Sequence, residues 1–207
     1  MTEQVRTRNP RGEGGRLRDE IVAAAVELLD ETGDQSAITL RSVARRVGIA
    51  APSIYRHFPD QPAIMLAVVR QHLTELESVL RAAVVAAGAD ARQKLMFLSH
   101  AYLGFAEQHP ERYRVMFGGV WKPALGESSV TAADLAGLGD ATLGLLTAAV
   151  EACVAAGDSA STEPYADAVA LWLGLHGLAH QRSVSAVFPW PADMADRMIR
   201  SLAHLRA

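Results

Sequence analysis

One short stretch of the chain, residues 39–58, concentrates side chains that can hydrogen bond to a nucleic acid. Its hydrogen-bonding side chains near the end are Ser53, Tyr55, Arg56 and His57. Its three other arginines are Arg41, Arg45 and Arg46. Ala51 and Pro52 offer apolar surface to thymine methyl groups, and Thr39 offers a hydroxyl group and a helix N-terminus to a phosphate. The set favours contact with phosphates and base edges.

Two short helices must position these side chains. Apolar residues at helical spacing predict a helix over residues 40–47, with Thr39 as its N-cap residue. Gly48 ends this helix, and Pro52 suits the first turn of the next one, which ends at Pro59. Two helices joined by a glycine-containing turn are typical of a helix-turn-helix, whose second helix enters the major groove. The sequence therefore predicts a DNA-reading hairpin.

The same region resembles the TetR/AcrR family of regulators. The resemblance is carried by residues 21–29, 38–49 and 53–58, and its most specific part is the Tyr-Arg-His-Phe ending at Phe58. It implies an Ω-shaped homodimer with two DNA-binding heads and a ligand-binding C-terminal core. It also implies that Thr39, Tyr55 and His57 contact phosphates.

The resemblance implies that the base edges face residues 50–53 and Arg56. The whole predicted DNA-binding set is Thr39, Arg41, Ala50, Ala51, Pro52, Ser53, Tyr55, Arg56 and His57. The family often has Ser or Thr in place of Ala50 and Lys in place of Gln61, so this chain should make fewer phosphate contacts and show a shallower salt dependence. Arginines between residues 6 and 18 are expected to compensate along the backbone or in a minor groove.

Composition and periodicity predict an all-α fold of about nine helices. Half of the 207 residues are hydrophobic, and Val and Ile stand singly inside helical patterns rather than in alternating runs. The expected helices are 16–32, 40–47, 52–58, 60–87, 91–109, 110–117, 131–156, 164–188 and 191–206. The expected domains are a disordered arginine-rich arm (1–15), a helix-turn-helix domain (16–60) and a ligand-binding and dimerisation domain (61–207).

The formal net charge of -3 hides an asymmetry between the two ends of the chain. Residues 1–70 carry ten arginines against nine acidic residues, and residues 71–207 carry ten basic against fourteen acidic ones. The single cysteine excludes an internal disulfide, and no stretch reads as a signal peptide or a membrane span. We expect a soluble, cytoplasmic protein that makes no membrane contact, from a GC-rich bacterial genome given its excess of Arg over Lys.

The expected helix 164–188 is apolar nearly all round, so it must be buried on two sides. One face would close the subunit's own pocket, and the other would pack against a symmetry mate. With the last helix, 191–206, as its partner, this predicts a homodimer through the last two helices. Residues 109–113 and 172–177 also resemble a C-terminal domain type of the same family, which does not fix the ligand.

A ligand pocket needs apolar walls and a few convergent polar groups. The predicted lining is Tyr102, Phe105, Arg112, Met116, Phe117, Trp121, Trp172 and His176, with His100 as a further polar point. Aromatic residues at helical spacing also fit an ordinary core. His176 and His180 have metal-ligand spacing, but no carboxylate or cysteine stands near them in sequence, so we expect no metal and no cofactor.

The function that these features predict is a ligand-responsive transcriptional regulator, a repressor released from double-stranded operator DNA by a small, mostly apolar effector. An architectural DNA-binding protein without an effector is an alternative, although it would need a basic balance over the whole chain. An enzyme acting on the pocket ligand is a second alternative. We expect no enzyme, because the sequence has no G-x-S-x-G, H-E-x-x-H, glycine-rich phosphate loop or Cys/His cluster.

Overall fold

The computed structural model describes residues 14–119 and 121–206. Over these residues it has ten α-helices and one 3-10 turn, and its only extended pairing is an isolated bridge between Ser159 and Leu205. The predicted all-α class is confirmed. Most of the predicted arm, residues 1–13, lies outside the described residues, and Gly14 and Gly15 already belong to the first helix.

The chain divides into two compact units. The division falls inside α4 (Gln61–Ala86), after Gln71, and inside α6 (Pro110–Phe117), after Tyr113. Both helices therefore contribute residues to each unit. The domain boundary expected at residues 60 and 61 stays a prediction.

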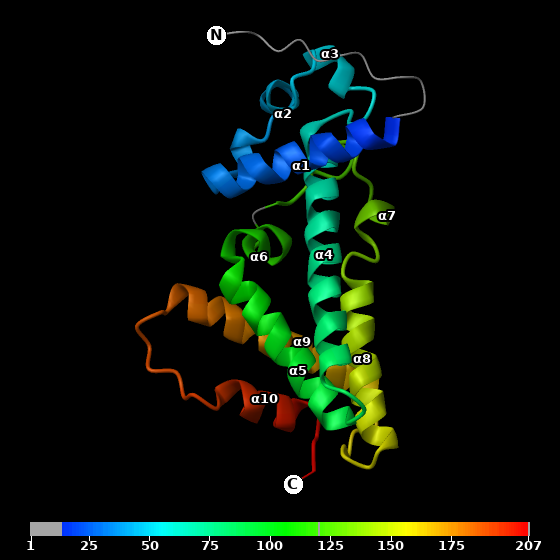
Figure 1. Cartoon of the computed structure of the whole chain (residues 1–207), viewed down its shortest axis with the longest axis vertical. Helices are drawn as coiled ribbons and strands as arrows, with labels where there is room; N and C mark the ends of the chain where they lie inside the picture. Colours follow the sequence, from blue (N-terminus) through cyan, green and yellow to red (C-terminus); the bar gives the residue numbers. More distant parts are fainter. Residues whose placement is uncertain (1–13, 120, 207) are drawn as a thin grey trace. The chain divides into compact units, whose positions relative to one another are not determined.

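The first unit contains the predicted helix-turn-helix (Figure 1). Its elements are α1 (Gly14–Thr32), the 3-10 turn η1 (Gln35–Ala37), α2 (Leu40–Val47), α3 (Ala51–Ile54), the start of α4, the end of α6 and α7 (Ala132–Leu135). Helix α1 packs against η1 and α2, and α2 packs against α3. The fully buried side chains that join them include Ile21, Leu29, Ile38, Val43, Ile54, Phe58 and Ile64.

Residues 114–136 belong to the first unit because three polar contacts hold them there. The Arg114 guanidinium donates to the carbonyl oxygen of Gly33. The Asp60 carboxylate accepts hydrogen bonds from the backbone N–H of Ser129 (2.6 Å) and from its hydroxyl (2.9 Å). Arg70 lies 3.3 Å from the Asp134 carboxylate.

The second unit contains the rest of α4 and α6 with α5 (Ala91–Gln108), α8 (Asp140–Ala155), α9 (Pro164–Val184) and α10 (Met194–Leu202). Helix α8 packs on α5 and α9, and α10 packs on the same two helices. Gly174 allows the close approach of α10. A Cβ atom there would lie only 2.7 Å from Leu202 Cδ1 and 2.9 Å from Met198 Cε.

The segment expected to be one helix, 131–156, is two helices. Gly137 (φ 78°) and Gly139 (φ 88°) adopt left-handed conformations between α7 and α8, which interrupt helical hydrogen bonding. By length and composition alone, residues 132–155 are apolar enough to cross a membrane, and a core helix of an ordinary globular protein meets the same criterion. The two glycines break that stretch.

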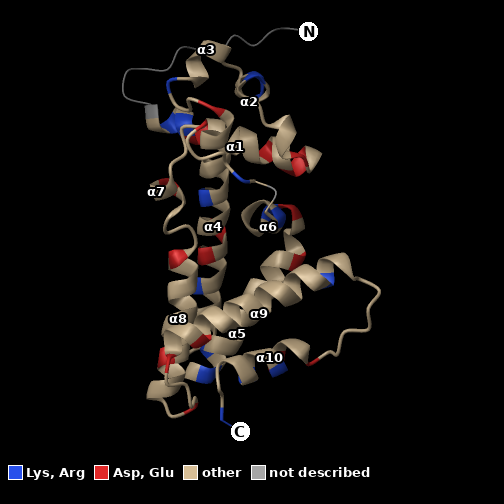
Figure 2. Ribbon diagram, turned by 180° about the vertical axis from the view of Figure 1, so that it is seen from behind, with Lys and Arg blue, Asp and Glu red and all other residues tan. Residues whose placement is uncertain are grey.

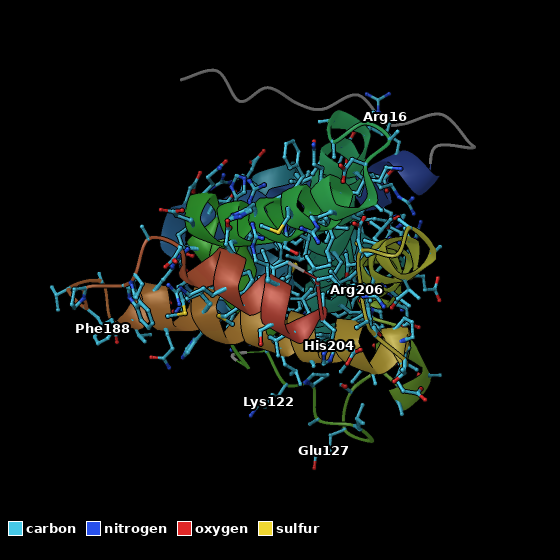
Figure 3. All side chains as sticks on the ribbon, turned by 90° about the horizontal axis from the view of Figure 1, so that it is seen from below. Arg16, Lys122, Glu127, Phe188, His204 and Arg206 are labelled. Atoms are coloured by element: carbon cyan, nitrogen blue, oxygen red, sulfur yellow. The ribbon has the colours of Figure 1, made fainter. Side chains whose placement is uncertain are left out.

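The last two helices are shorter than expected. Helix α9 ends at Val184 and α10 begins at Met194, so residues 185–193 form a loop. Within it the rings of Phe188 and Trp190 lie 4.6 Å apart, and the Trp190 indole N–H donates to the Ser185 carbonyl at 3.3 Å. Phe188 projects at the outer edge of this loop (Figure 3).

Candidate functional site

The turn between α2 and α3 is set by hydrogen bonds at both ends of α2. The Thr39 hydroxyl accepts from the Ser42 backbone N–H at 3.0 Å, and the Ser42 hydroxyl accepts from the Thr39 backbone N–H at 2.8 Å. This reciprocal capping box fixes the start of the helix. At its other end Gly48 has a φ of 75°, which favours glycine. Thr39 is thus the N-cap residue that the sequence predicted, and a phosphate contact would use a hydroxyl already engaged in the cap.

Helix α3 is shorter than the predicted segment 52–58, but helical hydrogen bonding continues beyond its last residue. The Phe58 backbone N–H donates to the Ile54 carbonyl at 2.9 Å, and both side chains are fully buried. Burial of these two residues orients the intervening ones outward: Tyr55 is 59% exposed, Arg56 is exposed and His57 is half-buried. The predicted reading residues therefore occupy one accessible turn.

The start of α3 has no side-chain cap. Ala50, its N-cap residue, makes no side-chain capping bond, and it is exposed. Pro52 has no N–H to leave open. Ser53 donates its backbone N–H to the Ala50 carbonyl at 2.8 Å. Because residue 50 is alanine, the N-terminus of α3 lacks the side-chain hydroxyl that Ser or Thr would provide there.

The three arginines of α2 have different roles. Arg41 and Arg45 are exposed and have no ion-pair partner within residues 14–119 and 121–206. Arg46 instead reaches α1, where it pairs with Glu31 and lies 3.3 Å from Glu27 (Figure 2 colours these charges). The hydrogen bond from Arg46 lowers the pKa of Glu31, and the same bond raises the pKa of the guanidinium. Arg46 therefore orients α2 on α1.

Two further contacts that sequence reasoning missed hold the head together. The Arg18 guanidinium lies over the Phe58 ring, 4.8 Å from its centroid, in a cation–π contact. The Gln61 side chain donates to the Gln35 carbonyl at 3.2 Å. Gln61, where the family often has a lysine, therefore links α4 to η1. Both contacts join residues too distant in sequence for periodicity to reveal them.

The second unit contains a chain of polar rings, in which Tyr102 and Tyr113 are buried and His176 and Trp172 are half-buried. The hydroxyl groups of Tyr102 and Tyr113 lie 3.1 Å apart, and the Tyr113 hydroxyl lies 2.7 Å from Nδ1 of His176. The His176 ring stacks on Trp172, with ring centroids 5.8 Å apart. The chain links α5, α6 and α9.

The protonation states of this chain follow from its burial. Burial raises the pKa of Tyr102 to about 12 and raises that of Tyr113 further, so both phenols stay neutral. Burial, with the nearby charge of His180, lowers the pKa of His176. A neutral imidazole carries one N–H, so the tautomer of His176 decides whether Nδ1 or the Tyr113 hydroxyl is the donor in this bond.

The structure divides the predicted ligand residues between the two units. Those in the second unit are Tyr102, Phe105, Arg112, Trp172 and His176; those in the first are Met116, Phe117 and Trp121. Arg112 pairs with Glu75 at 3.0 Å. His100 is on the surface instead of in a pocket, because it is 49% exposed and hydrogen bonds to Asp196 at 2.7 Å.

Each unit contains cavities of its own. One of about 410 Å³ in the first unit is lined by Gln35, Ser36, Gln61, Pro62, Met65, Trp121, Lys122, Pro123 and Ala124. One of about 270 Å³ in the second unit is lined by Leu103, Ala106, Glu107, Pro110, Ala179, Arg182 and Ser183. Of the predicted ligand residues, Trp121 lines the first cavity. A ligand role for any of the eight stays a prediction.

Known proteins resemble this chain in sequence. The HTH-type transcriptional activator FasR of Mycolicibacterium smegmatis is 30% identical over 131 residues, which cover 56% of this chain and 59% of FasR. The nucleoid occlusion factor SlmA of Vibrio campbellii is 26% identical over 101 residues, 49% of this chain and 51% of SlmA. The chain thus spans little more than half the length of these relatives.

The fold also matches a solved structure along nearly its whole length. A protein of unknown function from Rhodococcus sp. RHA1 aligns with 97% of this chain and 100% of its own, at 27% identity and a TM-score of 0.75. The family model of bacterial regulatory proteins of the tetR family matches residues 21–68. The model of the tetracyclin repressor-like C-terminal domain matches residues 95–205, more than half of the chain. The chain therefore belongs to the TetR family of DNA-binding regulatory proteins.

Proposed function

We propose that the protein is an effector-responsive homodimer that reads operator DNA with α3 and is released from it by a small molecule bound in the C-terminal unit. The observation that carries the DNA-reading part is the outward turn after α3. Ile54 and Phe58 are buried, whereas Tyr55 and Arg56, which directly follow the last residue of α3, are exposed. Tyr55 and His57 are assigned to phosphates, and Arg56 with residues 50–53 to base edges.

Fluorescence anisotropy of labelled DNA from upstream of the protein's own gene tests this assignment. We expect that DNA to bind about 10³-fold or more tightly than shuffled DNA. Tyr55→Ala and Arg56→Ala should abolish most of this preference. Arg200→Ala, an exposed arginine on α10, is the matched control and should bind as the unchanged protein does. If every fragment selected from the whole genome binds with the same affinity and salt slope as shuffled DNA, specific reading is refuted.

The homodimer is assigned to one face of α8 and α9. On α9, Leu173 (54% exposed) and Val184 (62% exposed) lie with Gly177 on a face that no other element of the unit covers. On α8, Gly144 and Ala148 are also exposed. Small and apolar residues exposed on two neighbouring helices favour close packing with a second copy.

This assignment replaces α10 as an interface helix. Met198 and Leu202 of α10 turn toward Gly174 of the same protomer, and the exposed residues of α10 include Arg197 and Arg200. Such a polar outer face is poorly suited to an apolar interface.

Effector binding is assigned to the second unit, with a mostly apolar ligand. Helices α4 and α6 continue from one unit into the other, so a ligand that shifts either helix can change the spacing of the two heads. Coupling must be reciprocal: saturating operator should weaken effector binding by the factor by which effector weakens operator binding. Effector affinity that saturating operator leaves unchanged would exclude this mechanism.

Two alternatives to repression are suggested by the names of the relatives. FasR is named as an activator and SlmA as a nucleoid occlusion factor, so activation and an architectural role both need testing. Transcription in vitro from a bound promoter separates repression, which lowers transcript, from activation, which raises it. An architectural protein would bind DNA equally with every compound tested.

The remaining assignments follow from the regulator role. The division into an arm (1–15), a head (16–60) and a ligand-binding and dimerisation domain (61–207) is proposed for function. Because the target is chromosomal DNA, the proposed place of action is the cytoplasm. We propose that the protein is not an enzyme. Repeated conversion of a bound compound, measured by chromatography, would overturn this.

A further inference from the structure

The 270 Å³ cavity of the second unit combines an apolar floor with charged side chains. It lies between α5 and α9, which pack side by side (Figure 1). Leu103, Ala106 and Ala179 are buried and form its apolar surface. The volume is close to the lower limit of typical ligand pockets, about 300 Å³, so it suits a small molecule.

Two side chains of opposite charge line this cavity, and no ion pair joins them among the described residues. Glu107 is exposed near the end of α5, and Arg182 is half-buried in the last turn of α9. Neither has an ion-pair partner in the part of the chain that the structure describes. Some other charged residues of this unit are paired, among them Arg112 with Glu75 at 3.0 Å and Arg81 with Glu77 at 2.6 Å.

Each charge suits one kind of ligand group. The planar guanidinium of Arg182 can donate two parallel hydrogen bonds to a carboxylate. Glu107 attracts a cation, and the C-terminal end of α5 beside it adds partial negative charge that favours an ammonium group. The Ser183 hydroxyl donates to the His180 carbonyl at 2.7 Å, so its oxygen is left to accept.

We propose that this cavity binds an amphipathic zwitterion, such as an α-amino acid with an apolar side chain. The carboxylate lies at Arg182, the ammonium at Glu107, and the side chain packs on Leu103, Ala106 and Ala179. The proposal deepens the proposed function by naming the class of effector, and it rests on that function only for its effect on DNA. Binding itself can be measured without DNA.

Isothermal titration calorimetry of the full chain with matched probes tests the charge pattern. L-phenylalanine carries both charges, 3-phenylpropionate only the carboxylate, and 2-phenylethylamine only the ammonium; L-leucine is the aliphatic zwitterion. We expect L-phenylalanine or L-leucine to bind, and each single-charge analogue to bind about tenfold or more weakly than L-phenylalanine. If neither amino acid gives saturable heat, or if an analogue equals L-phenylalanine, the proposal is overturned.

Two variants assign the charges to the ligand groups. Arg182→Gln should weaken L-phenylalanine and 3-phenylpropionate about tenfold and leave 2-phenylethylamine unchanged. Glu107→Gln should weaken binding of 2-phenylethylamine about tenfold and leave that of 3-phenylpropionate unchanged. Arg200→Gln and Glu151→Gln, exposed residues away from this cavity, are the matched controls and should change nothing. Unchanged affinity for L-phenylalanine in both cavity variants overturns the assignment.

Operator binding separates this inference from the proposed function. If the charge pattern holds but no operator fragment is bound specifically, the zwitterion site stands and the regulator role fails. If operator binding is specific but none of the zwitterions binds, the regulator role stands and this site fails. If both hold, added L-phenylalanine should lower operator affinity in the unchanged protein, and about tenfold more of it should be needed in Arg182→Gln.

Discussion

The Tyr113 hydroxyl lies 2.7 Å from Nδ1 of His176, and through this bond α6 is held to α9. The same hydroxyl lies 3.1 Å from that of Tyr102 on α5. Tyr113 is therefore the central member of a chain that joins three helices. Because Tyr113 is 8% exposed and Tyr102 is 4% exposed, water cannot easily replace a lost partner.

Tyr113→Phe should destabilise the protein by about 1–3 kcal/mol, because it leaves buried polar groups without a hydrogen-bond partner. Urea unfolding followed by circular dichroism gives this value. Tyr165→Phe removes a hydroxyl from a side chain that is 64% exposed, so its unfolding midpoint should not change. Equal midpoints for the two variants would mean that the Tyr113 hydroxyl contributes nothing to stability.

The buried phenols also predict a loss of stability in alkali. Their folded-state pKa is raised, to about 12 for Tyr102, above the ordinary value of about 10. A raised pKa contributes stability that is complete below the unfolded pKa and is lost as pH rises through the folded one. The free energy of unfolding should therefore fall between pH of about 10 and 12.

Ultraviolet absorbance of tyrosinate checks this titration directly. Replacing Tyr55 and Tyr165 by Phe leaves only Tyr102 and Tyr113 as reporters, since the chain has four tyrosines. In this variant no tyrosinate should form until the pH approaches about 12 or the protein unfolds. Ionisation of either phenol near pH 10 in the folded protein would contradict the burial argument.

The sequence predicted the elements that local pattern determines. Helix spacing, the Thr39 cap and the Gly48 turn depend on neighbouring residues, and each is present in the structure. The break between α7 and α8 was missed, although Gly137 and Gly139 mark it, because the apolar content on both sides resembles one continuous helix.

The contacts that organise the sites could not be read from local pattern. Arg46 pairs with acidic residues 15 and 19 positions earlier, and Tyr113 meets His176 across 63 residues. The 270 Å³ cavity is similarly formed where α5, α6 and α9 meet, so Arg182 and Glu107 gave no signal of their own. Which helical face stays uncovered also depends on packing, so the proposed interface on α8 and α9 rests on exposure that local pattern does not show.

Arg41 and Arg46 should differ in their effect on DNA binding. Arg41 is exposed and available to a phosphate, whereas Arg46 is bound to Glu31 and Glu27. In an anisotropy salt series, Arg41→Gln should reduce the slope of log affinity against log salt by about 0.9, the value for one phosphate contact. Arg46→Gln should leave the slope unchanged, with only a slightly lower unfolding midpoint of the head. An equal loss of slope in both variants would place Arg46 on the DNA as well.

Leu173→Glu should dissociate the proposed homodimer. Leu173 is 54% exposed on the face of α9 assigned to the interface, and a buried unpaired carboxylate there opposes association strongly. Sedimentation velocity should show a monomer, and operator affinity should fall because two heads no longer bind together. Arg200→Glu on the outer face of α10 is the control and should remain dimeric. The opposite pattern, with Arg200→Glu monomeric and Leu173→Glu dimeric, would favour α10, the second of the two helices that the sequence predicted for the interface.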